Sequence, residues 1–341
     1  MKKSLMTLGV LALFVLMAYG QEKKFALYSV AFYNMENLFD TIHDEGKNDY
    51  EYLPNGTNQW NTMKYKAKLK NMSEILSMLS TDKLPMGPAI IGVSEIENYR
   101  VLEDILKQPA LADRGYQYVH YEGEDQRGVD CAFFYNPKLF ELTNSKLVPY
   151  VYINDTVHKT RGFLIASGNI AGEKMHFIVN HWPSRAAASP VRERAGEQVR
   201  AIKDSLLRED SAAKIVIMGD MNDDPMDKSM AVALGAKRKP VDAGPTDLYN
   251  PWWDTLKKGY GTLMYKGKWN LFDQIVFTGN LLGTDRSTLK FYKHEIFRRD
   301  FMFQKEGKYK GYPKRTQAGG VWLNGYSDHL PTIIYLIKEV K

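Results

Sequence analysis

The stretch from Ala213 to Pro225 constrains the fold more than any other part of the chain. Residues 215–218 read Ile-Val-Ile-Met, an uninterrupted apolar run that is typical of a strand covered on both faces. Gly219 ends this run, and short polar side chains follow it: Asp220, Asn222, Asp223 and Asp224. A buried strand holds such groups rigidly, as a catalytic carboxylate or a phosphate-binding amide requires. The same residues also form ordinary turns, so this stretch alone leaves both interpretations open.

Length and composition favour one globular domain. The chain has 341 residues, of which 44% are hydrophobic and 25% are charged, so it can bury a large core. We find no low-complexity linker or internal repeat, and we expect a single domain over residues 21–341. The formal net charge of +6 favours anionic substrates without identifying one. Cys131 is the only cysteine, which excludes an internal disulfide.

The first 20 residues have the features of a signal peptide. Lys2 and Lys3 precede an almost wholly apolar run over residues 5–17, and Ala18-Tyr19-Gly20 places small residues where a signal peptidase cleaves. The apolar run is shorter than the roughly 20 residues that a spanning helix requires. We therefore expect export to the periplasm or the extracellular space, with no transmembrane span in the mature chain.

Five further segments combine a predicted strand with polar residues at its end or edge. The strands are expected over residues 25–32, 88–93, 174–179, 269–277 and 332–337. Their polar residues are Asn34 and Glu36, then Glu95, then Asn180 and His181, then Asp273, and finally Asp328 and His329. Any one of these could be a turn or a satisfied core group, but six such segments together indicate a shared site. The two-residue spacing of Asn34 and Glu36 predicts that both point the same way along an extended chain.

Helices are expected between several of these strands. Apolar residues recur at helical spacing over residues 64–79, and a second helix is expected from Val101 to Leu106. A third is expected to have Ser189 as its N-cap and Pro190 as its first residue.

The residue types limit the chemistry of the site. Carboxylates and amides without a cysteine cluster suit a hard cation, Mg²⁺ first and Mn²⁺ or Ca²⁺ as alternatives. Zinc would favour more His or Cys ligands, and the chain has no H-E-x-x-H motif. There is also no P-loop and no kinase signature. Hydrolysis of a phosphoester by a positioned water fits this set best.

These motifs resemble, in order and spacing, those of the endonuclease/exonuclease/phosphatase superfamily. The motifs are Asn34-x-Glu36, Ser94-Glu95-Ile96-Glu97-Asn98, Asn180-His181, Gly219-Asp220-Met221-Asn222, Phe272-Asp273 and Ser327-Asp328-His329. The superfamily includes deoxyribonucleases, abasic-site endonucleases, sphingomyelinases and inositol polyphosphate phosphatases, and the resemblance covers about residues 24–337. It implies an α/β fold in which a two-sheet β-sandwich is flanked by helices, as four α/β/β/α layers.

The resemblance also implies a metal site. Glu95 is the expected principal metal carboxylate. Asn34, Glu36 and Asp328 are expected nearby as direct or water-mediated ligands. Glu36 stands where abasic endonucleases carry an aspartate.

Catalytic roles are implied in the same way. Asp220 is expected to orient or deprotonate the attacking water, and Asn222 to position a phosphate or a water. His329 is expected to contact the scissile phosphate, with Asp273 as its orienting partner. His181 resembles the second histidine of the deoxyribonuclease and sphingomyelinase branches.

Two arginines are candidates for binding the non-reacting phosphate oxygens. Arg127 precedes the predicted strand 129–135, and Arg185 follows His181. A guanidinium presents a planar fork that matches phosphate. Both could equally be solvated surface residues.

The substrate is less constrained than the chemistry. Residues 290–315 contain nine Lys or Arg and three acidic residues, interleaved with aromatic residues, which suits a nucleic-acid backbone and its bases. The same pattern also fits a surface excursion whose aromatics pack inward. We expect an exported nuclease acting on DNA or RNA, with no stable protein partner. The alternatives are a lipid or inositol phosphate hydrolase, for which Trp252-Trp253 is a candidate membrane contact, and a non-catalytic binding protein.

Overall fold

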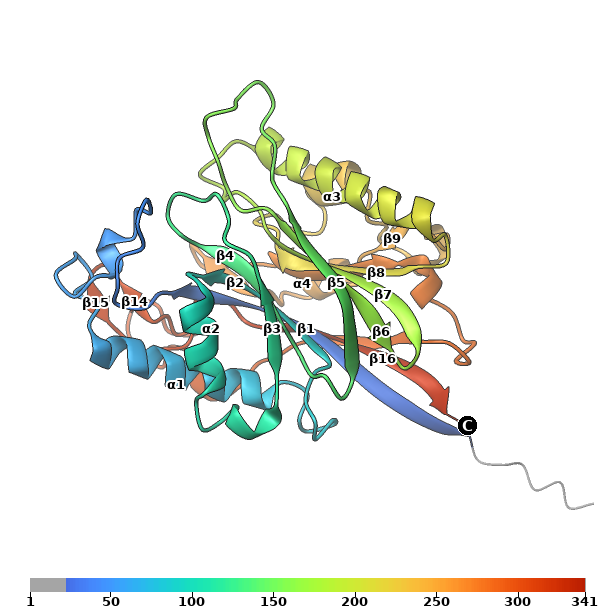
Figure 1. Cartoon of the computed structure of the whole chain (residues 1–341), viewed down its shortest axis with the longest axis horizontal. Helices are drawn as coiled ribbons and strands as arrows, with labels where there is room; N and C mark the ends of the chain where they lie inside the picture. Colours follow the sequence, from blue (N-terminus) through green and yellow to red (C-terminus); the bar gives the residue numbers. More distant parts are fainter. Residues whose placement is uncertain (1–22, 341) are drawn as a thin grey trace, which may run out of the picture.

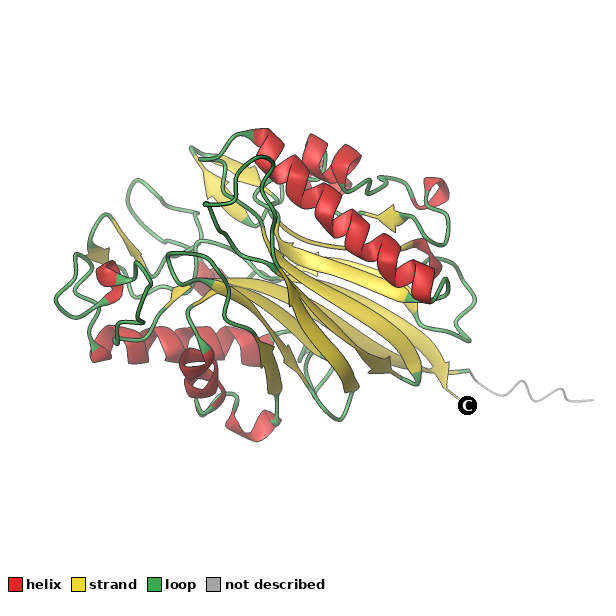
Figure 2. Cartoon of the chain, turned by 45° about the horizontal axis from the view of Figure 1, so that its top comes forward, coloured by secondary structure: helices red, strands yellow, loops and turns green. Residues whose placement is uncertain are grey.

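Two six-stranded sheets pack face to face in residues 23–340, which are the residues that this computed structural model describes. Helices cover the outer face of each sheet, α3 on one side and α1 and α2 on the other (Figures 1 and 2). The expected four-layer α/β/β/α sandwich is therefore confirmed. The predicted signal peptide at residues 1–20 lies outside the described residues. Between residues 23 and 340, no helix is long and apolar enough to cross a membrane.

The first sheet joins the two ends of the described chain. Its strand order is β13 (Lys290–Ile296), β16 (Thr332–Val340), β1 (Lys24–Leu38), β2 (Ile90–Ile96), β4 (Asp130–Tyr135) and β3 (Gln117–His120). β1 and β2 are parallel and are connected through α1 (Thr62–Met78), and every other pair in this sheet is antiparallel. A parallel pair requires such a crossover, whereas the loop 121–129 joins the antiparallel strands β3 and β4 as a hairpin.

The second sheet repeats this plan. Its strand order is β5 (Phe140–Val148), β6 (Phe163–Ile170), β7 (Glu173–His181), β8 (Lys214–Asp220), β12 (Asp273–Thr278) and β9 (Leu248–Tyr249). β7 and β8 form its parallel pair, and α3 (Ser189–Glu209) connects them. Each sheet therefore has two neighbouring strands whose carboxyl ends meet at the same edge.

Three layers of apolar side chains hold the sandwich together. The central layer lies between the sheets and includes Phe32, Phe133, Phe177 and Met218. The two outer layers pack the first sheet against α1 and α2 (Tyr99–Leu106), and the second sheet against α3. Both faces of β8 are therefore covered, as its uninterrupted apolar run predicts.

Shorter elements surround the end of the sandwich where β1 and β8 finish. They are α4 (Trp253–Lys257), β10 (Leu263–Tyr265), β11 (Lys268–Asn270), β14 (Gln317–Ala318) and β15 (Val321–Trp322). Single turns of 3₁₀ or π helix occur at Tyr50–Tyr52, Ala112–Arg114, Ser229–Ala233, Pro240–Asp242, Gly279–Leu281 and Asp300–Met302.

The three expected helices are present, but each begins at a different residue from the one expected. Asn61 caps α1 through its side chain, which accepts a hydrogen bond from the Lys64 amide, so the helix begins two residues earlier than expected. In α3 the N-cap is Ala188, and Ser189 is the first helical residue. The expected Ser189 cap is therefore wrong, and Pro190 is the second helical residue rather than the first. The Ser189 hydroxyl donates instead to Glu193 one turn later.

A polar cluster fixes the chain where it leaves β1. Glu97 accepts a hydrogen bond from the Asp40 amide at 2.7 Å, and Arg100 pairs with Asp40 and Asp44 at 2.6 and 2.5 Å. Burial, together with the negative charges of Asp40 and Asp44, raises the pKa of Glu97 to about 9. Glu97 is therefore protonated in the folded protein at neutral pH.

The raised pKa predicts how stability depends on pH. The unfolded chain loses the Glu97 proton near pH 4.3, whereas the folded chain keeps it to about pH 9. This group therefore favours folding fully below about pH 4 and progressively less as pH rises toward 9. We expect Glu97→Gln, which cannot ionise, to gain at least about 1 kcal/mol relative to wild type between pH 5 and pH 8, measured by urea unfolding. Glu103→Gln, on the exposed face of α2, should show no such trend, and equal pH dependence of both variants would contradict the raised pKa.

Candidate active site

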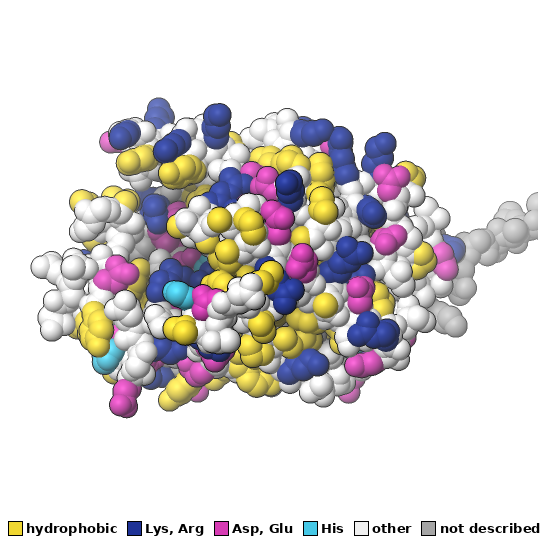
Figure 3. Space-filling model, turned by 90° about the horizontal axis from the view of Figure 1, so that it is seen from above, with side chains coloured by type: hydrophobic (Ala, Val, Ile, Leu, Met, Phe, Trp, Pro, Cys, Tyr) yellow, Lys and Arg dark blue, Asp and Glu magenta, His cyan; other side chains and the backbone are white. Residues whose placement is uncertain are grey.

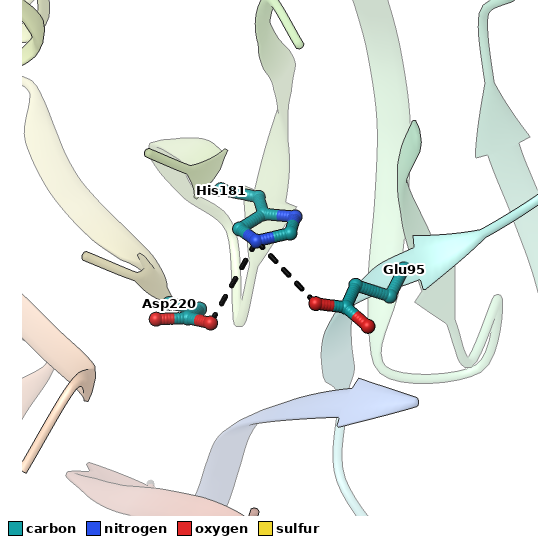
Figure 4. Close-up of side chains that lie close together, drawn as sticks. All are labelled: Glu95, His181 and Asp220. Carbon is teal, nitrogen blue, oxygen red and sulfur yellow. Dashed lines mark ion pairs between the residues drawn. The ribbon is translucent and has the colours of Figure 1, made fainter. Parts of the chain in front are cut away.

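The carboxyl ends of the two parallel strand pairs bring four predicted residues together. Asn34 comes from β1, Glu95 from β2, His181 from β7 and Asp220 from β8. The His181 Nε2 lies 3.6 Å from Glu95 Oε1 and 3.7 Å from Asp220 Oδ2, so the imidazole faces both carboxylates (Figure 4). The Asn34 Nδ2 donates to Asp220 Oδ2 at 3.0 Å and to Glu95 Oε1 at 3.3 Å.

Unusual backbone conformations aim these side chains. Glu95 and Asn222 have left-handed φ values of 58° and 51°, and Glu36 and Asn37 have values of 45° and 53°. The β1–β2 ladder shifts register between Asn34 and Leu38, next to Glu36. A bulge inserts a residue and re-aims the side chains around it, and strained backbone of this kind clusters at functional sites.

A second group adjoins Asp220. Asp273 on β12 pairs directly with Asp220 across the ladder, and its Oδ2 lies 2.7 Å from Nδ1 of His329. The other imidazole nitrogen, Nε2, lies 3.9 Å from Asp220 Oδ2. The expected pairing of Asp273 with His329 is therefore present in the structure. Asp328 adds a third carboxylate, with its Oδ1 3.9 Å from the same Nε2.

The two histidines have opposite charge states. Burial alone would lower the pKa of His329, but Asp273, Asp220 and Asp328 outweigh it and raise that pKa well above its ordinary value. Burial lowers the pKa of His181 well below its ordinary value, and the nearby cations Arg161 and Arg127 lower it further. Asp220 therefore lies between a protonated imidazole and a neutral one.

The donor set fits a hard divalent cation. Burial raises the pKa of Asp220 to about 7; His329 opposes this rise, while Asp273 and Glu95 add to it. The carboxylates of Asp273 and Glu95 thus lie close enough to disfavour the charged form of Asp220. Glu95, His181 and Asp220 each offer a ligand atom, and these atoms lie within 4.8 Å of one another. Oxygen-rich sites of this kind suit Mg²⁺, Mn²⁺ or Ca²⁺.

Asn34 acts as a donor to these carboxylates. Its Oδ1 accepts the Glu36 amide at 2.8 Å, which fixes the side-chain amide so that Nδ2 faces Glu95 and Asp220. The predicted role of Asn34 as a direct or water-mediated metal ligand stays a prediction, because Oδ1 keeps a second lone pair beside this hydrogen bond.

Glu36 has different hydrogen-bond partners from Asn34 and Glu95. Its carboxylate accepts hydrogen bonds from Arg315 Nε at 2.8 Å and from the Thr316 amide at 2.7 Å, and Lys68 Nζ lies 3.9 Å away. The expectation that Glu36 and Asn34 point the same way is therefore wrong, because the bulge turns Glu36 toward this network. Arg315 also pairs with Asp328 at 2.9 Å and so links the network to the site.

The two predicted phosphate-binding arginines differ in how they are held. Half of the Arg127 side chain is exposed, and its nearest carboxylate, Asp125, is 3.6 Å away. Arg185 pairs with Asp223, Asp224 and Asp227 at 2.7–3.2 Å, and its guanidinium lies 4.4 Å from the centre of the Phe272 ring. Arg127 is thus available to a phosphate, whereas Arg185 is largely engaged by the turn after β8.

Asn222 is anchored beside the site. Its amide nitrogen donates to Asp220 Oδ1 at 2.9 Å, and its Nδ2 donates to the Trp182 carbonyl at 3.0 Å. The side-chain oxygen remains the group that could accept from a water. Asp223 and Asp224 support this turn through their pairs with arginines.

Three cations near the site were missed by sequence reasoning. Arg161 is buried and donates to Asp125 and to the Trp182 carbonyl; it lies in a loop with no strand-end signal. Arg315 was counted only as part of the basic segment. Lys68 is fully buried, and its position on the apolar stripe of α1, one residue before Leu69, was the signal that could have identified it.

The different surroundings of Glu95 and Glu36 predict different effects of substitution. Glu95→Gln should weaken Mn²⁺ binding at least about tenfold, because it removes a charged donor. Glu36→Gln should leave Mn²⁺ affinity within about twofold but lower the free energy of unfolding by about 2–4 kcal/mol, because it breaks a buried ion network. Mn²⁺ titration followed by electron paramagnetic resonance, with thermal unfolding of the metal-free variants, measures both. Equal loss of metal affinity in the two variants would return Glu36 to the ligand set.

Comparison with known proteins agrees with this geometry. No curated protein is similar enough in sequence to match the chain. Three similar solved structures are an endonuclease/exonuclease/phosphatase family protein from Bacteroides thetaiotaomicron, a mannosyl-6-phosphatase from the same organism, and D. rerio TDP2 in complex with a single-strand DNA product. Each is 14% identical, with TM-scores of 0.58, 0.56 and 0.52. The alignments cover 93%, 91% and 91% of this chain, and 97%, 99% and 99% of the respective structures.

These structures show a shared fold. The family evidence comes from the sequence itself, because residues 29–338 match the family described as Endonuclease/Exonuclease/phosphatase. That match includes every strand-end motif from Asn34 to His329. The chain therefore belongs to the endonuclease/exonuclease/phosphatase family of phosphoester hydrolases.

Proposed function

We propose that the chain is an exported phosphodiesterase that uses Mg²⁺ and acts on nucleic acid. The observation that carries the hydrolytic part is the position of Asp220, whose Oδ2 lies 3.7 Å from Nε2 of one histidine and 3.9 Å from Nε2 of the other. A water held at this carboxylate would have a base on one side and a charged imidazole on another. Export rests on the signal pattern of residues 1–20.

The residues of the chain divide the chemical work. Asp220 orients the attacking water and accepts its proton, which suits a carboxylate whose pKa burial raises to about 7. His329, protonated and fixed by Asp273, donates a hydrogen bond to a phosphate oxygen as negative charge develops there. Neutral His181 accepts a hydrogen bond from the attacking water, and Arg127 binds a non-reacting oxygen of the phosphate. A divalent cation held by Glu95, with Asp328 nearby, would supply charge stabilisation at the phosphate.

The charge distribution near the site supports a polyanionic substrate. Figure 3 shows Lys and Arg side chains around a hollow in which acidic side chains gather. The basic segment predicted from the sequence reaches the site at Arg315, and it carries exposed aromatic rings at Phe301 and Tyr309. Cations interleaved with exposed rings fit a nucleic-acid strand. TDP2, similar in fold, has been crystallised with a single-strand DNA product.

A cavity beside the site favours a second candidate, a sugar phosphate monoesterase. This cavity of about 390 Å³ is lined by Glu36, Asn37, Glu51, Asn58, Arg315 and the rings of Tyr52 and Trp60, among others. Amide and carboxylate groups around aromatic rings suit a neutral hydroxylated group. One structure of similar fold is a mannosyl-6-phosphatase.

The lipid alternative loses the feature that suggested it. Trp252 is fully buried, and its indole nitrogen donates to the Ile275 carbonyl at 2.9 Å. The Trp252-Trp253 pair therefore presents no exposed double tryptophan to a membrane. The expected absence of a stable protein partner remains part of the proposal.

The substrate proposal predicts the outcome of a panel assay. We expect the mature protein to cleave single-stranded DNA or RNA oligonucleotides with Mg²⁺ and to lose that activity in EDTA, because the carboxylates then lack their counter-charge. Parallel reactions contain plasmid DNA, mannose 6-phosphate, sphingomyelin and inositol phosphates. Release of phosphate from mannose 6-phosphate alone would favour the second candidate. Nuclease activity that survives EDTA would contradict metal dependence.

The role of Asp220 predicts a large kinetic effect. Asp220→Asn should lower kcat about 10²–10⁴-fold, because the amide cannot accept the proton of the attacking water. KM should change little, because the side chain keeps its shape. Asp224→Asn, in the same turn but turned toward Arg185, should cost less than about tenfold. Steady-state kinetics on bis-p-nitrophenyl phosphate compare the two, and similar losses in both variants would remove Asp220 from its assigned role.

A further inference from the structure

A second cavity lies outside the site, and half of the residues that line it are cations. Its volume is about 390 Å³, and its charged residues are Arg298, Arg299, Lys305 and Lys310, with Asp300 as the single acid. Phe303, Gln304 and Gly311 complete its walls. This excess of positive charge in a concave surface attracts anions.

Arg298 is held in this cavity by aromatic rings. Its guanidinium carbon lies 4.9 Å from the ring centres of Trp269 and Phe303 and 5.7 Å from that of Tyr260. Trp269 and Phe303 meet edge to face, with their ring planes at 81°. Such stacking fixes a planar cation and leaves its edge to form hydrogen bonds.

One donor of this fixed guanidinium is unused. Arg298 Nη1 is buried and has no hydrogen-bond partner within residues 23–340. No carboxylate within that range forms an ion pair with Arg298. By contrast, Arg185 and Arg192 form four close ion pairs with carboxylates of the turn after β8. A buried donor without an acceptor is unfavourable, so the charge of this guanidinium is poorly compensated by the described residues.

Backbone hydrogen bonds connect the walls of the cavity to the active site. The Phe297 amide, next to Arg298, donates to the Pro331 carbonyl at 2.8 Å, two residues after His329. On the other side, β10 forms a bridge to His329 through Leu263, and β10 pairs with the strand that carries Trp269. Backbone hydrogen bonds close the loop that forms the cavity wall. The Gln304 amide donates to the Tyr312 carbonyl, and the Gly311 amide donates to the Gln304 carbonyl.

We propose that this cavity binds a phosphate group of the nucleic-acid strand other than the one that is cleaved. Arg298 provides the fixed contact, and Lys305 and Lys310 provide mobile charges around it. The enzyme would then recognise a strand that extends beyond the site, and oligonucleotides would bind more tightly than mononucleotides. This proposal rests on the proposed nuclease function and adds the position of a second phosphate.

The test measures binding to a fluorescein-labelled oligothymidylate of twelve nucleotides, in the Asp220→Asn background so that no cleavage occurs. The pair Lys305→Gln/Lys310→Gln should weaken binding at least about tenfold at low salt and reduce the slope of log Kd against log salt by about 0.7, the contribution of the one single-strand phosphate contact that this cavity would provide. Arg298→Lys keeps the charge but loses the planar fork, and it should weaken binding severalfold.

The matched control is Lys138→Gln/Lys174→Gln, which removes the same charge at the opposite end of the sandwich. Lys174 is the second residue of β7, which ends at His181 in the site. Lys138 follows the last residue of β4, Tyr135, at the opposite end of that strand from Asp130. The control should leave the affinity within about twofold of the Asp220→Asn parent and the salt slope unchanged. The same substitutions are also made in the wild-type background. Turnover of bis-p-nitrophenyl phosphate by these proteins reports whether each variant assembles the metal site.

The possible failures are distinguishable. If Lys305→Gln/Lys310→Gln and the control pair bind the oligonucleotide alike, the phosphate site is overturned while the nuclease proposal stands. If wild type hydrolyses bis-p-nitrophenyl phosphate but neither cleaves nor binds oligonucleotides, the nucleic-acid proposal fails and the phosphate site fails with it.

Discussion

Burial of carboxylates at one end of the sandwich is the constraint on which the rest of the site depends. Asp220 and Asp273 are almost fully buried on neighbouring strands, and Glu95 faces them from the other sheet. Like charges this close disfavour ionisation, which is why burial and these neighbours raise the pKa of Asp220 to about 7. The fold offsets the charge with protonated His329 and with the Asn34 amide group. A bound cation would complete that compensation, so metal affinity follows from the same burial that destabilises the metal-free site.

A second buried network holds the surrounding loops to this core. Lys68 on α1 donates to Thr316 and to the Tyr326 carbonyl, and Glu36 on β1 binds Arg315 and the Thr316 amide. Because Arg315 also pairs with Asp328, movement of the 314–328 segment would displace a carboxylate of the site. Burial lowers the pKa of Lys68 to about 8, an effect that Glu36 opposes. The segment is therefore fixed by charges whose removal one at a time would leave the others unpaired.

The sequence was most informative where a strand ends in its own polar residues. The run before Asp220 and the motifs around Glu95, His181 and His329 depend on local order, and the structure brings all of them to one edge. Glu36 could not be assigned in this way, because its direction depends on Arg315, 279 positions later in the chain. Arg161 shows the same limit, since its partners Asp125 and Trp182 lie on separate loops.

The fold itself was predicted less completely at one side of the second sheet, where β5 is the edge strand and β6 its neighbour. β5 and β6 were not expected from the sequence, because polar residues and Gly168 interrupt the apolar alternation. The structure explains this glycine: a Cβ at Gly168 would lie 2.4 Å from the Phe140 ring and 2.2 Å from the Glu141 carbonyl oxygen. The close approach of β5 to β6 requires it, although glycine lowers strand propensity on its own. A residue that weakens a local pattern can thus be the one that tertiary packing demands.

The two cavities near the site have opposite electrostatic character, and this contrast relates the candidate substrates to the fold. The cavity beside Arg315 contains the carboxylates of Glu36 and Glu51, which repel a second phosphate. The cavity around Arg298 has four cations and one acid. Residues of the segment 298–320 line both cavities. The first cavity suits a neutral group, and the second suits an anion. A strand with a sugar and base in the first cavity and a phosphate in the second would satisfy both, whereas a sugar phosphate would use only the first.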